Sequence, residues 1–135
     1  MVLIFGASSD RMSFQHSSRI IGPLVRWLFP KLSEQTVGDI VFAVRKCAHV
    51  TEYAILAMLL WRALRKPVKQ DSRPWKGSEA RFALFLAALY SASDEFHQTF
   101  VPSRQGSVWD VLLDTSGAAL GLLFLWLLGR WRKRW

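Results

Sequence analysis

The sequence predicts an all-α membrane protein, a small bundle of about four transmembrane helices with one short amphipathic helix beside them. Three observations lead to this fold class. About half of the residues (51%) are hydrophobic, the basic residues gather just outside the apolar stretches, and several of the seven Trp residues stand near predicted helix ends. An amphipathic indole ring suits the membrane interface. A length of 135 residues predicts a single domain spanning 1–135.

The net charge of +8 is distributed as in membrane proteins. Lys and Arg concentrate in residues 62–81 and in the tail 130–135, and both groups directly adjoin apolar segments. The positive-inside rule places both groups in the cytoplasm. We therefore expect a multi-pass protein of the inner (cytoplasmic) membrane with both termini in the cytoplasm, and no nucleic-acid partner despite the basic charge.

The first two predicted helices are short. Residues 1–7 are apolar, but as a helix they reach only ~10 Å, against a hydrocarbon core of about 30 Å. The first transmembrane helix is therefore expected to be truncated, either starting upstream of Met1 or inserting partway. Residues 19–30 predict a short helix with its apolar side chains on one face. This helix is expected to lie on the membrane surface, with a core-facing helix as the alternative.

Three longer helices are predicted after it, from about 36 to 65, from 78 to just before Pro102, and from Ser107 to about Arg130. The first of them exceeds the bilayer in length, so its start is expected to project beyond the membrane or to break near Gly38. Only the stretch 111–129 approaches the roughly 20 apolar residues of a spanning helix, and an aspartate interrupts it. A soluble helical bundle therefore stays open as an alternative.

Two polar clusters stand out, in residues 45–53 and 94–104. Ionisable side chains at membrane depth are costly and are usually functional. Under the expected topology, the ionisable residues of both clusters and of the last helix's start all lie toward the outside: Lys46, His49, Glu52, Asp94, Glu95, His97, Arg104, Asp110 and Asp114. The sequence thus predicts one shared polar site at the external face.

Helical spacing sorts these residues into three stripes. One stripe holds Lys46, His49 and Tyr53; a second holds Asp94, His97 and Gln98, with Glu95 pointing about a quarter turn away; the third holds Asp110, Asp114, Gly117 and Gly121. The two glycines form a small-xxx-small pattern, which lets another helix approach closely. The carboxylates of the third stripe are therefore expected to point into the bundle.

Three chemistries fit this set, and the sequence leaves open whether the protein is an enzyme. Two His with Asp and Glu can bind zinc or manganese and activate water, although no tight ligand motif is present. Alternatively, Lys46 and Arg104 clamp a phosphate while His49 or His97 acts as acid or base. The third chemistry is binding alone, of a lipid headgroup or a cell-wall precursor. The sequence identifies no particular metal or cofactor.

Plainer roles are open for several of these residues. Asp110 stands three residues after Ser107 and would complete a capping box. Asp114 with Lys46 would make a structural ion pair. The remaining alternatives are headgroup anchoring for Lys46 and Arg104, charge balance for Glu52, and structural hydrogen bonding for His49 and His97.

The two clusters make the chain resemble the VanZ-like family of small bacterial integral membrane proteins. The resemblance covers most of the chain from Ser8 onward and is carried by Arg45-Lys46-Cys47-Ala48-His49, Glu52-Tyr53, Asp94-Glu95-Phe96-His97-Gln98, Phe100, Pro102, Arg104, Asp110, Asp114 and Gly117. It implies a single four-helix membrane domain of the cell envelope. Because the founding member is associated with low-level resistance to the glycopeptide teicoplanin, it also implies a link with antibiotic resistance. It implies no particular reaction.

We therefore expect an external polar site that engages an anionic envelope lipid or a lipid-linked cell-wall precursor. Two alternatives remain, a metal-assisted or His-dependent phosphoesterase acting on an envelope lipid, and a non-catalytic accessory protein. The candidate catalytic residues are His49, Asp94, Glu95 and His97. The candidate substrate contacts are Lys46, Glu52, Gln98, Arg104, Asp110 and Asp114.

Overall fold

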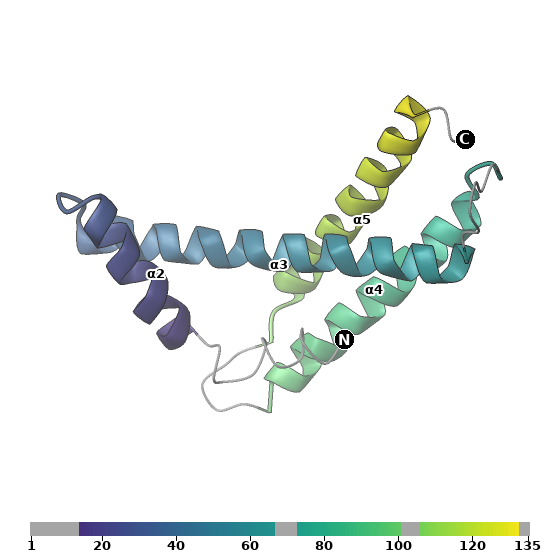
Figure 1. Cartoon of the computed structure of the whole chain (residues 1–135). Coiled ribbons are helices and arrows are strands. Elements are labelled where there is room, and N and C mark those ends of the chain that lie inside the picture. The colour runs from purple at the N-terminus through teal and green to yellow at the C-terminus, as the bar shows by residue number, and fades with distance from the viewer. Residues whose placement is uncertain (1–13, 67–72, 101–105, 133–135) are drawn as a thin grey trace.

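The computed structural model describes residues 14–66, 73–100 and 106–132 (Figure 1). This part of the chain is helical and without strands, which confirms the all-α prediction. Its helices are α2 (Phe14–Leu28), α3 (Glu34–Arg65), α4 (Gly77–Gln98) and α5 (Val108–Trp131). Among the described residues, one helix, α5, is long and apolar enough to cross a membrane. The bundle of about four spans is therefore not confirmed, and the apolar segment 1–7 lies outside the described residues.

Helix α2 begins five residues earlier than the predicted 19–30 and ends two residues sooner, close to Pro30. Its Val25 packs against Val37 and Val41 of α3, so the helix has the core-facing contact that the sequence left as an alternative. Its outer side is apolar as well, with Trp27 77% exposed. Side-chain contact with α3 thus accounts for one face of α2 and leaves the other uncovered.

Helix α3 runs unbroken for 32 residues, which is ~48 Å at the standard rise. The hydroxyl of Ser33 caps its start by accepting a hydrogen bond from the Thr36 backbone N–H at 3.2 Å. The break considered near Gly38 is absent. The helix ends at Lys66, which adopts a left-handed conformation (φ 44°) and donates its N–H to the carbonyl of Arg62 at 3.0 Å.

Contacts between the helices define their relative directions. Gly117 and Gly121 of α5 face Val50 and Ala54 of α3, so the two helices run the same way. Helix α4 runs the opposite way to α5, because Ser91 contacts the second turn of α5 while the later Glu95 contacts Ser107 just before it. Figure 1 shows α5 crossing α3 near its middle and α4 crossing it closer to its end, while α2 packs near its start.

Small side chains let these three helices approach closely. The buried core between them consists of Tyr53, Leu56, Ala57, Trp61, Ala83, Ala87, Ala118 and Leu122. A Cβ atom placed on Gly117 would lie 2.5 Å from the Val50 carbonyl oxygen, and one on Gly121 would lie 2.6 Å from that of Ala54. The backbones of α3 and α5 therefore touch where the sequence predicted close packing.

Buried Arg65 organises the corner between α3 and α4. Its guanidinium donates to the carbonyls of Arg73 and of Pro74 (3.1 Å for the latter) and lies 3.8 Å from the Glu79 carboxylate. Trp61 and Trp75 stack beside it, with ring centroids 4.7 Å apart. The sequence pattern groups Arg65 with the basic residues of a cytoplasmic loop. Its side chain is instead buried and holds the backbone before α4 by hydrogen bonds.

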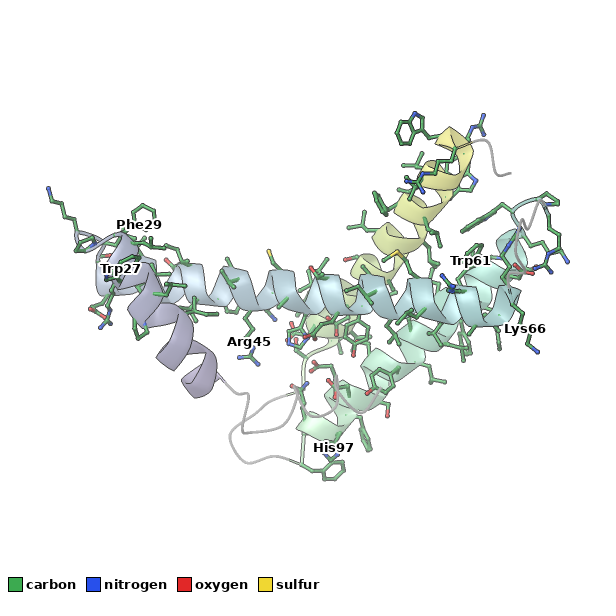
Figure 2. All side chains as sticks on the ribbon, viewed as in Figure 1. Trp27, Phe29, Arg45, Trp61, Lys66 and His97 are labelled. Atoms are coloured by element: carbon green, nitrogen blue, oxygen red, sulfur yellow. The ribbon has the colours of Figure 1, made fainter. Side chains whose placement is uncertain are left out.

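The outer surfaces of α3, α4 and α5 are apolar (Figure 2). Leu59, Phe85 and Phe124, one from each helix, are each 59% exposed. Many other large apolar side chains of these helices are exposed as well, as is typical of proteins that contact lipid or a partner. Most of the apolar stretch of α5 is likewise not buried within the protein. These exposed side chains favour the membrane over the soluble bundle.

Candidate functional site

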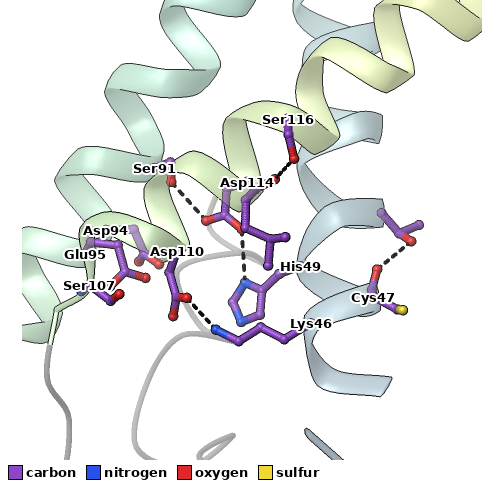
Figure 3. Close-up of polar contacts among 12 residues, drawn as sticks. Lys46, Cys47, His49, Ser91, Asp94, Glu95, Ser107, Asp110, Asp114 and Ser116 are labelled. Atoms are coloured by element: carbon purple, nitrogen blue, oxygen red, sulfur yellow. Dashed lines mark hydrogen bonds and ion pairs between the residues drawn. The ribbon is translucent and has the colours of Figure 1, made fainter. Parts of the chain in front are cut away.

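Three helices bring most of the predicted site residues to one level of the structure (Figure 3). They come from the middle of α3, the last turns of α4 and the first turns of α5. We call the following set the polar cluster: Lys46, His49, Ser91, Asp94, Glu95, Gln98, Asp110 and Asp114. The three stripes read from the sequence therefore face one another. Arg104 lies outside the described residues.

Lys46 pairs with Asp110 at the edge of the polar cluster. Its ammonium group donates to the Asp110 carboxylate, and the two side chains remain 27% and 34% exposed. This pairing differs from two structural roles that the sequence left open, the capping box of Ser107 with Asp110 and the ion pair of Lys46 with Asp114. The Ser107 side chain makes no capping hydrogen bond, so the capping box is not formed, and Lys46 does not pair with Asp114. Both members of the pair keep enough exposed surface to meet a ligand.

His49 and Asp114 form the second contact between α3 and α5. His49 Nδ1 lies 3.9 Å from Asp114 Oδ1, and the Ser91 hydroxyl donates to Asp114 Oδ2 at 2.9 Å. Asp114 is 2% exposed, whereas His49 is half-buried. A buried carboxylate that faces one imidazole nitrogen orients the ring and leaves the other nitrogen for a ligand or a proton. Ser91 donates to the carboxylate and not to His49, so the histidine does not activate this hydroxyl.

Gln98 joins the two acidic residues of α4. Its amide nitrogen donates to Asp94 Oδ2 at 3.1 Å and to Glu95 Oε1 at 3.2 Å. The other oxygen of Glu95 accepts the backbone N–H of Ser107 at 2.8 Å, which ties the end of α4 to the start of α5. Gly106 is needed at this point because a Cβ atom there would collide with the Glu95 carbonyl. These three polar side chains of α4 are buried and shape the site from within.

Carboxylates outnumber cations in and around the polar cluster. Glu52 is half-buried on α3 and interacts electrostatically with Asp94, which makes it a fifth carboxylate beside Asp94, Glu95, Asp110 and Asp114. Two cations of α3, Arg45 and Lys46, interact electrostatically with His49. Lys46 pairs with Asp110 and interacts favourably with Glu95, so this cation offsets part of the carboxylate charge.

His97 does not join the polar cluster. Its side chain is exposed, and Figure 2 shows it at the end of α4, away from the polar side chains between the helices. The sequence stripe placed it with Asp94 and Gln98 and assigned it a catalytic role. Ser107, just before α5, lies against Glu95, so Glu95 is enclosed while His97 is exposed.

Ser91 is the residue that sequence reasoning missed. It is fully buried and holds Asp114, a role that the sequence analysis did not assign to it. Its spacing was the available signal, because Ser91, Asp94 and Gln98 follow one helical face at intervals of three and four residues. A complete polar stripe on α4 would have included it.

Among residues 14–66, 73–100 and 106–132, no three His, Cys, Asp or Glu side chains are arranged to hold a metal ion. The predicted combination of two histidines with Asp and Glu is not assembled there, because His97 is apart from His49. Asp114 and Glu95 instead accept hydrogen bonds that join α4 to α5 and to Ser107 just before it, while Asp94 accepts one from Gln98 of its own helix.

The fold and the site define a small helical protein whose helices meet around a buried, carboxylate-rich polar cluster and present apolar side chains outward. The chain belongs to the VanZ/LLP1 family, which matches residues 1–129. The comparison with curated proteins and the comparison with solved structures gave no match. Family membership agrees with the resemblance read from the two polar clusters and is consistent with a membrane protein related to teicoplanin resistance.

Proposed function

We propose that this chain is a multi-pass protein of the cytoplasmic membrane whose polar cluster lies toward the outside. There it engages the phosphate group of an anionic envelope lipid or of a lipid-linked cell-wall precursor. One observation carries the proposal. Lys46 and His49 lie on one stripe of α3, both partly exposed, and each is backed by a carboxylate of α5.

The helix directions and lengths support this topology. Helices α3 and α5 run one way and α4 the other, as successive crossings require. From Lys46 to Arg65, α3 covers 20 residues, or ~30 Å, while α4 with 22 residues reaches ~33 Å and α5 with 24 reaches ~36 Å. A hydrocarbon core is about 30 Å thick. Counting the truncated first helix as one further crossing before α2 would put both termini in the cytoplasm.

A cysteine-labelling experiment tests the topology. Lys76 is exposed just before α4, at the end opposite the polar cluster, and Cys47 is exposed and must be replaced first. In a Cys47→Ala background, Lys76→Cys should react with a membrane-impermeant maleimide only after the inner face is opened. Ser103→Cys, in the α4–α5 connection, should react in intact cells. The reverse pattern would overturn the orientation.

The phosphate contact is assigned to Lys46, with His49 beside it. An ammonium group serves as a compact point charge for phosphate, and a hydrogen bond to a charged group contributes about 1.5–3 kcal/mol. Asp94 and Asp114, each 2% exposed, lie too deep to touch a bound ligand directly. In the proposal Asp114 positions His49 and joins α4 to α5, while Asp94 holds Gln98 within α4. The predicted anion contact Arg104 and the predicted contact Glu52 stay part of the proposal.

Binding of a polyprenyl diphosphate in detergent micelles, measured by isothermal titration calorimetry, tests this assignment. Lys46→Gln should weaken binding roughly tenfold or more. That variant also leaves Asp110 without its ammonium partner. A charge swap, Lys46→Asp with Asp110→Lys, separates loss of the phosphate contact from loss of the ion pair, because it keeps an ion pair while moving the cation. The swap should fold and still bind poorly. Lys31→Gln, at an exposed site of the α2–α3 turn, is the matched control. Unchanged affinity in Lys46→Gln would remove the phosphate role.

The contact between His49 and Asp114 favours a second candidate, a His-dependent phosphoesterase. In this reaction His49 takes a proton from the attacking water while the P–O bond to the leaving group breaks, and then returns a proton to the departing oxygen. His49→Gln should then abolish hydrolysis of a lipid phosphate while the protein still folds. Persistent turnover would dismiss the candidate. A metal-assisted phosphoesterase should instead co-purify with a metal ion that His49→Ala lacks. Elemental mass spectrometry of the two proteins measures this.

Membership of the VanZ/LLP1 family supports a link with teicoplanin resistance as part of the same proposal. Expression of the full chain in a susceptible host should raise the minimal inhibitory concentration of teicoplanin, and Lys46→Gln should reduce this effect. If the chain is instead a non-catalytic accessory protein, substitutions in the polar cluster should act through stability alone. Equal resistance from wild type and from a stably folded Lys46→Gln variant would separate resistance from phosphate binding.

A further inference from the structure

The end of the structure opposite the polar cluster carries a second concentration of charge, and it has the opposite sign. Exposed basic side chains come from the last turn of α3, the start of α4 and the end of α5. We call these residues the basic end: Arg62, Lys66, Lys76, Arg81, Arg130 and Arg132. Among the described residues, the carboxylate at this end is Glu79, which faces buried Arg65. The basic end therefore has a large positive charge on its surface.

The corner between α3 and α4 presents part of this charge in a fixed arrangement. Arg65 is buried and bonded to the chain that precedes α4, and Arg73 donates back to the carbonyl of Arg65 at 2.8 Å. The stack of Trp61 on Trp75 fills the space beneath. The buried guanidinium thus orders the backbone, while Arg62 and Lys66 project from it into solvent.

Apolar side chains directly adjoin the basic end. Phe82 and Phe85 are exposed next to Arg81 on α4, and Leu127 and Trp131 are exposed around Arg130 on α5. A soluble polyanion would leave these apolar side chains in water. A phospholipid offers a phosphate to the basic side chains and acyl chains to the apolar ones. The arrangement therefore selects a lipid over a nucleic acid or another soluble polyanion.

The spacing between the two charged levels matches a bilayer. Twenty residues separate Lys46 of the polar cluster from Lys66 of the basic end, a distance of ~30 Å along α3. This is about the thickness of a hydrocarbon core. We propose that the basic end binds the phosphate headgroups of anionic phospholipids in the inner leaflet, as a lipid site separate from the external polar cluster. The proposal rests on the topology proposed above and is independent of any ligand of the polar cluster.

Lipid titration of the full chain in detergent, followed by native mass spectrometry, tests this inference. Wild type should bind phosphatidylglycerol more tightly than phosphatidylcholine. Each cation near an anionic headgroup contributes roughly fivefold in affinity, so Arg62→Gln with Arg81→Gln should weaken phosphatidylglycerol binding about 25-fold. The matched control is Arg26→Gln with Lys31→Gln, which removes the same charge from the α2–α3 region and breaks an exposed ion pair of little energetic weight.

Three results would overturn the inference: equal affinity for the two lipids, an equal loss in the control pair, or displacement of the lipid by heparin, which would assign the basic end to a soluble polyanion. A variant with Arg62→Lys and Arg81→Lys guards against misfolding, because it should bind as wild type does. Labelling of Lys76→Cys from outside the cell would instead refute the topology. Loss of polyprenyl diphosphate binding in Lys46→Gln leaves the basic end untouched, so the two proposals fail separately.

Discussion

The close backbone contact between α3 and α5 predicts a large effect from a very small substitution. Gly117 of α5 lies against the backbone of Val50, and a Cβ atom there would stand 2.5 Å from the Val50 carbonyl oxygen and 2.9 Å from its Cα. Ordinary van der Waals contact begins at 3.4 Å. Gly117→Ala therefore requires α5 to move away from α3 by up to ~0.9 Å (3.4 − 2.5). Both clashing atoms belong to the backbone, so no side-chain rotation relieves the clash.

This displacement should lower the free energy of unfolding by about 1–3 kcal/mol, the usual cost of overpacking. It should also disturb the polar cluster, because His49 Nδ1 and Asp114 Oδ1 are already 3.9 Å apart, at the outer limit of an ion pair. Thermal unfolding in detergent, followed by tryptophan fluorescence, measures the first effect. Titration with polyprenyl diphosphate measures the second.

Gly38→Ala is the matched control. Gly38 lies inside α3, and a Cβ atom there has nothing within 4 Å. Alanine favours the helix by about 0.5–1 kcal/mol over glycine, so this variant should unfold at a slightly higher temperature than wild type. If Gly117→Ala is also as stable as wild type, the helices do not touch at Val50 and the reasoning is refuted.

Three further predictions concern buried polar contacts. Ser91→Ala removes the hydrogen bond to Asp114 and should destabilise the protein by about 1.5–3 kcal/mol in chemical denaturation; a loss below 0.5 kcal/mol would mean that the bond is not formed. Asp114→Ala should cost more than Ser91→Ala and should release His49, seen as a change in its imidazole NMR signals; unchanged signals would contradict the contact. Arg65→Gln should speed proteolysis between α3 and α4 without affecting polyprenyl diphosphate binding, whereas an unchanged cleavage rate would count against its role in ordering this corner.

The sequence predicted the elements of the fold well because each depends on local chemistry. Helices α3, α4 and α5 begin within two residues of the predicted starts at about 36, 78 and 107. The close approach of α5 to another helix followed from Gly117 and Gly121. The extent of α2 was underestimated, since the prediction began at Arg19 and the helix begins at Phe14.

Pairing within the site could not be predicted, because it depends on how two helices are placed against each other. The sequence suggested Lys46 with Asp114, and the structure pairs Lys46 with Asp110, one turn earlier on α5. Contact of Gly117 with Val50 and of Gly121 with Ala54 determines this register. Helical spacing within one helix carries no information about it. The same limit explains His97, whose exposure depends on which side of α4 packs against α5.

Close packing and charge are coupled in this site, which affects how any variant of it must be interpreted. Gly117 and Gly121 bring α5 against α3, and only then do Asp110 and Asp114 reach Lys46 and His49. Removing one charge therefore leaves its partner partly buried and uncompensated, which lowers stability whether or not a ligand binds there. Loss of binding after a single substitution cannot distinguish a ligand contact from a structural ion pair. The charge swap between Lys46 and Asp110 makes the distinction, because it keeps the attraction between the helices and moves only the position of the cation.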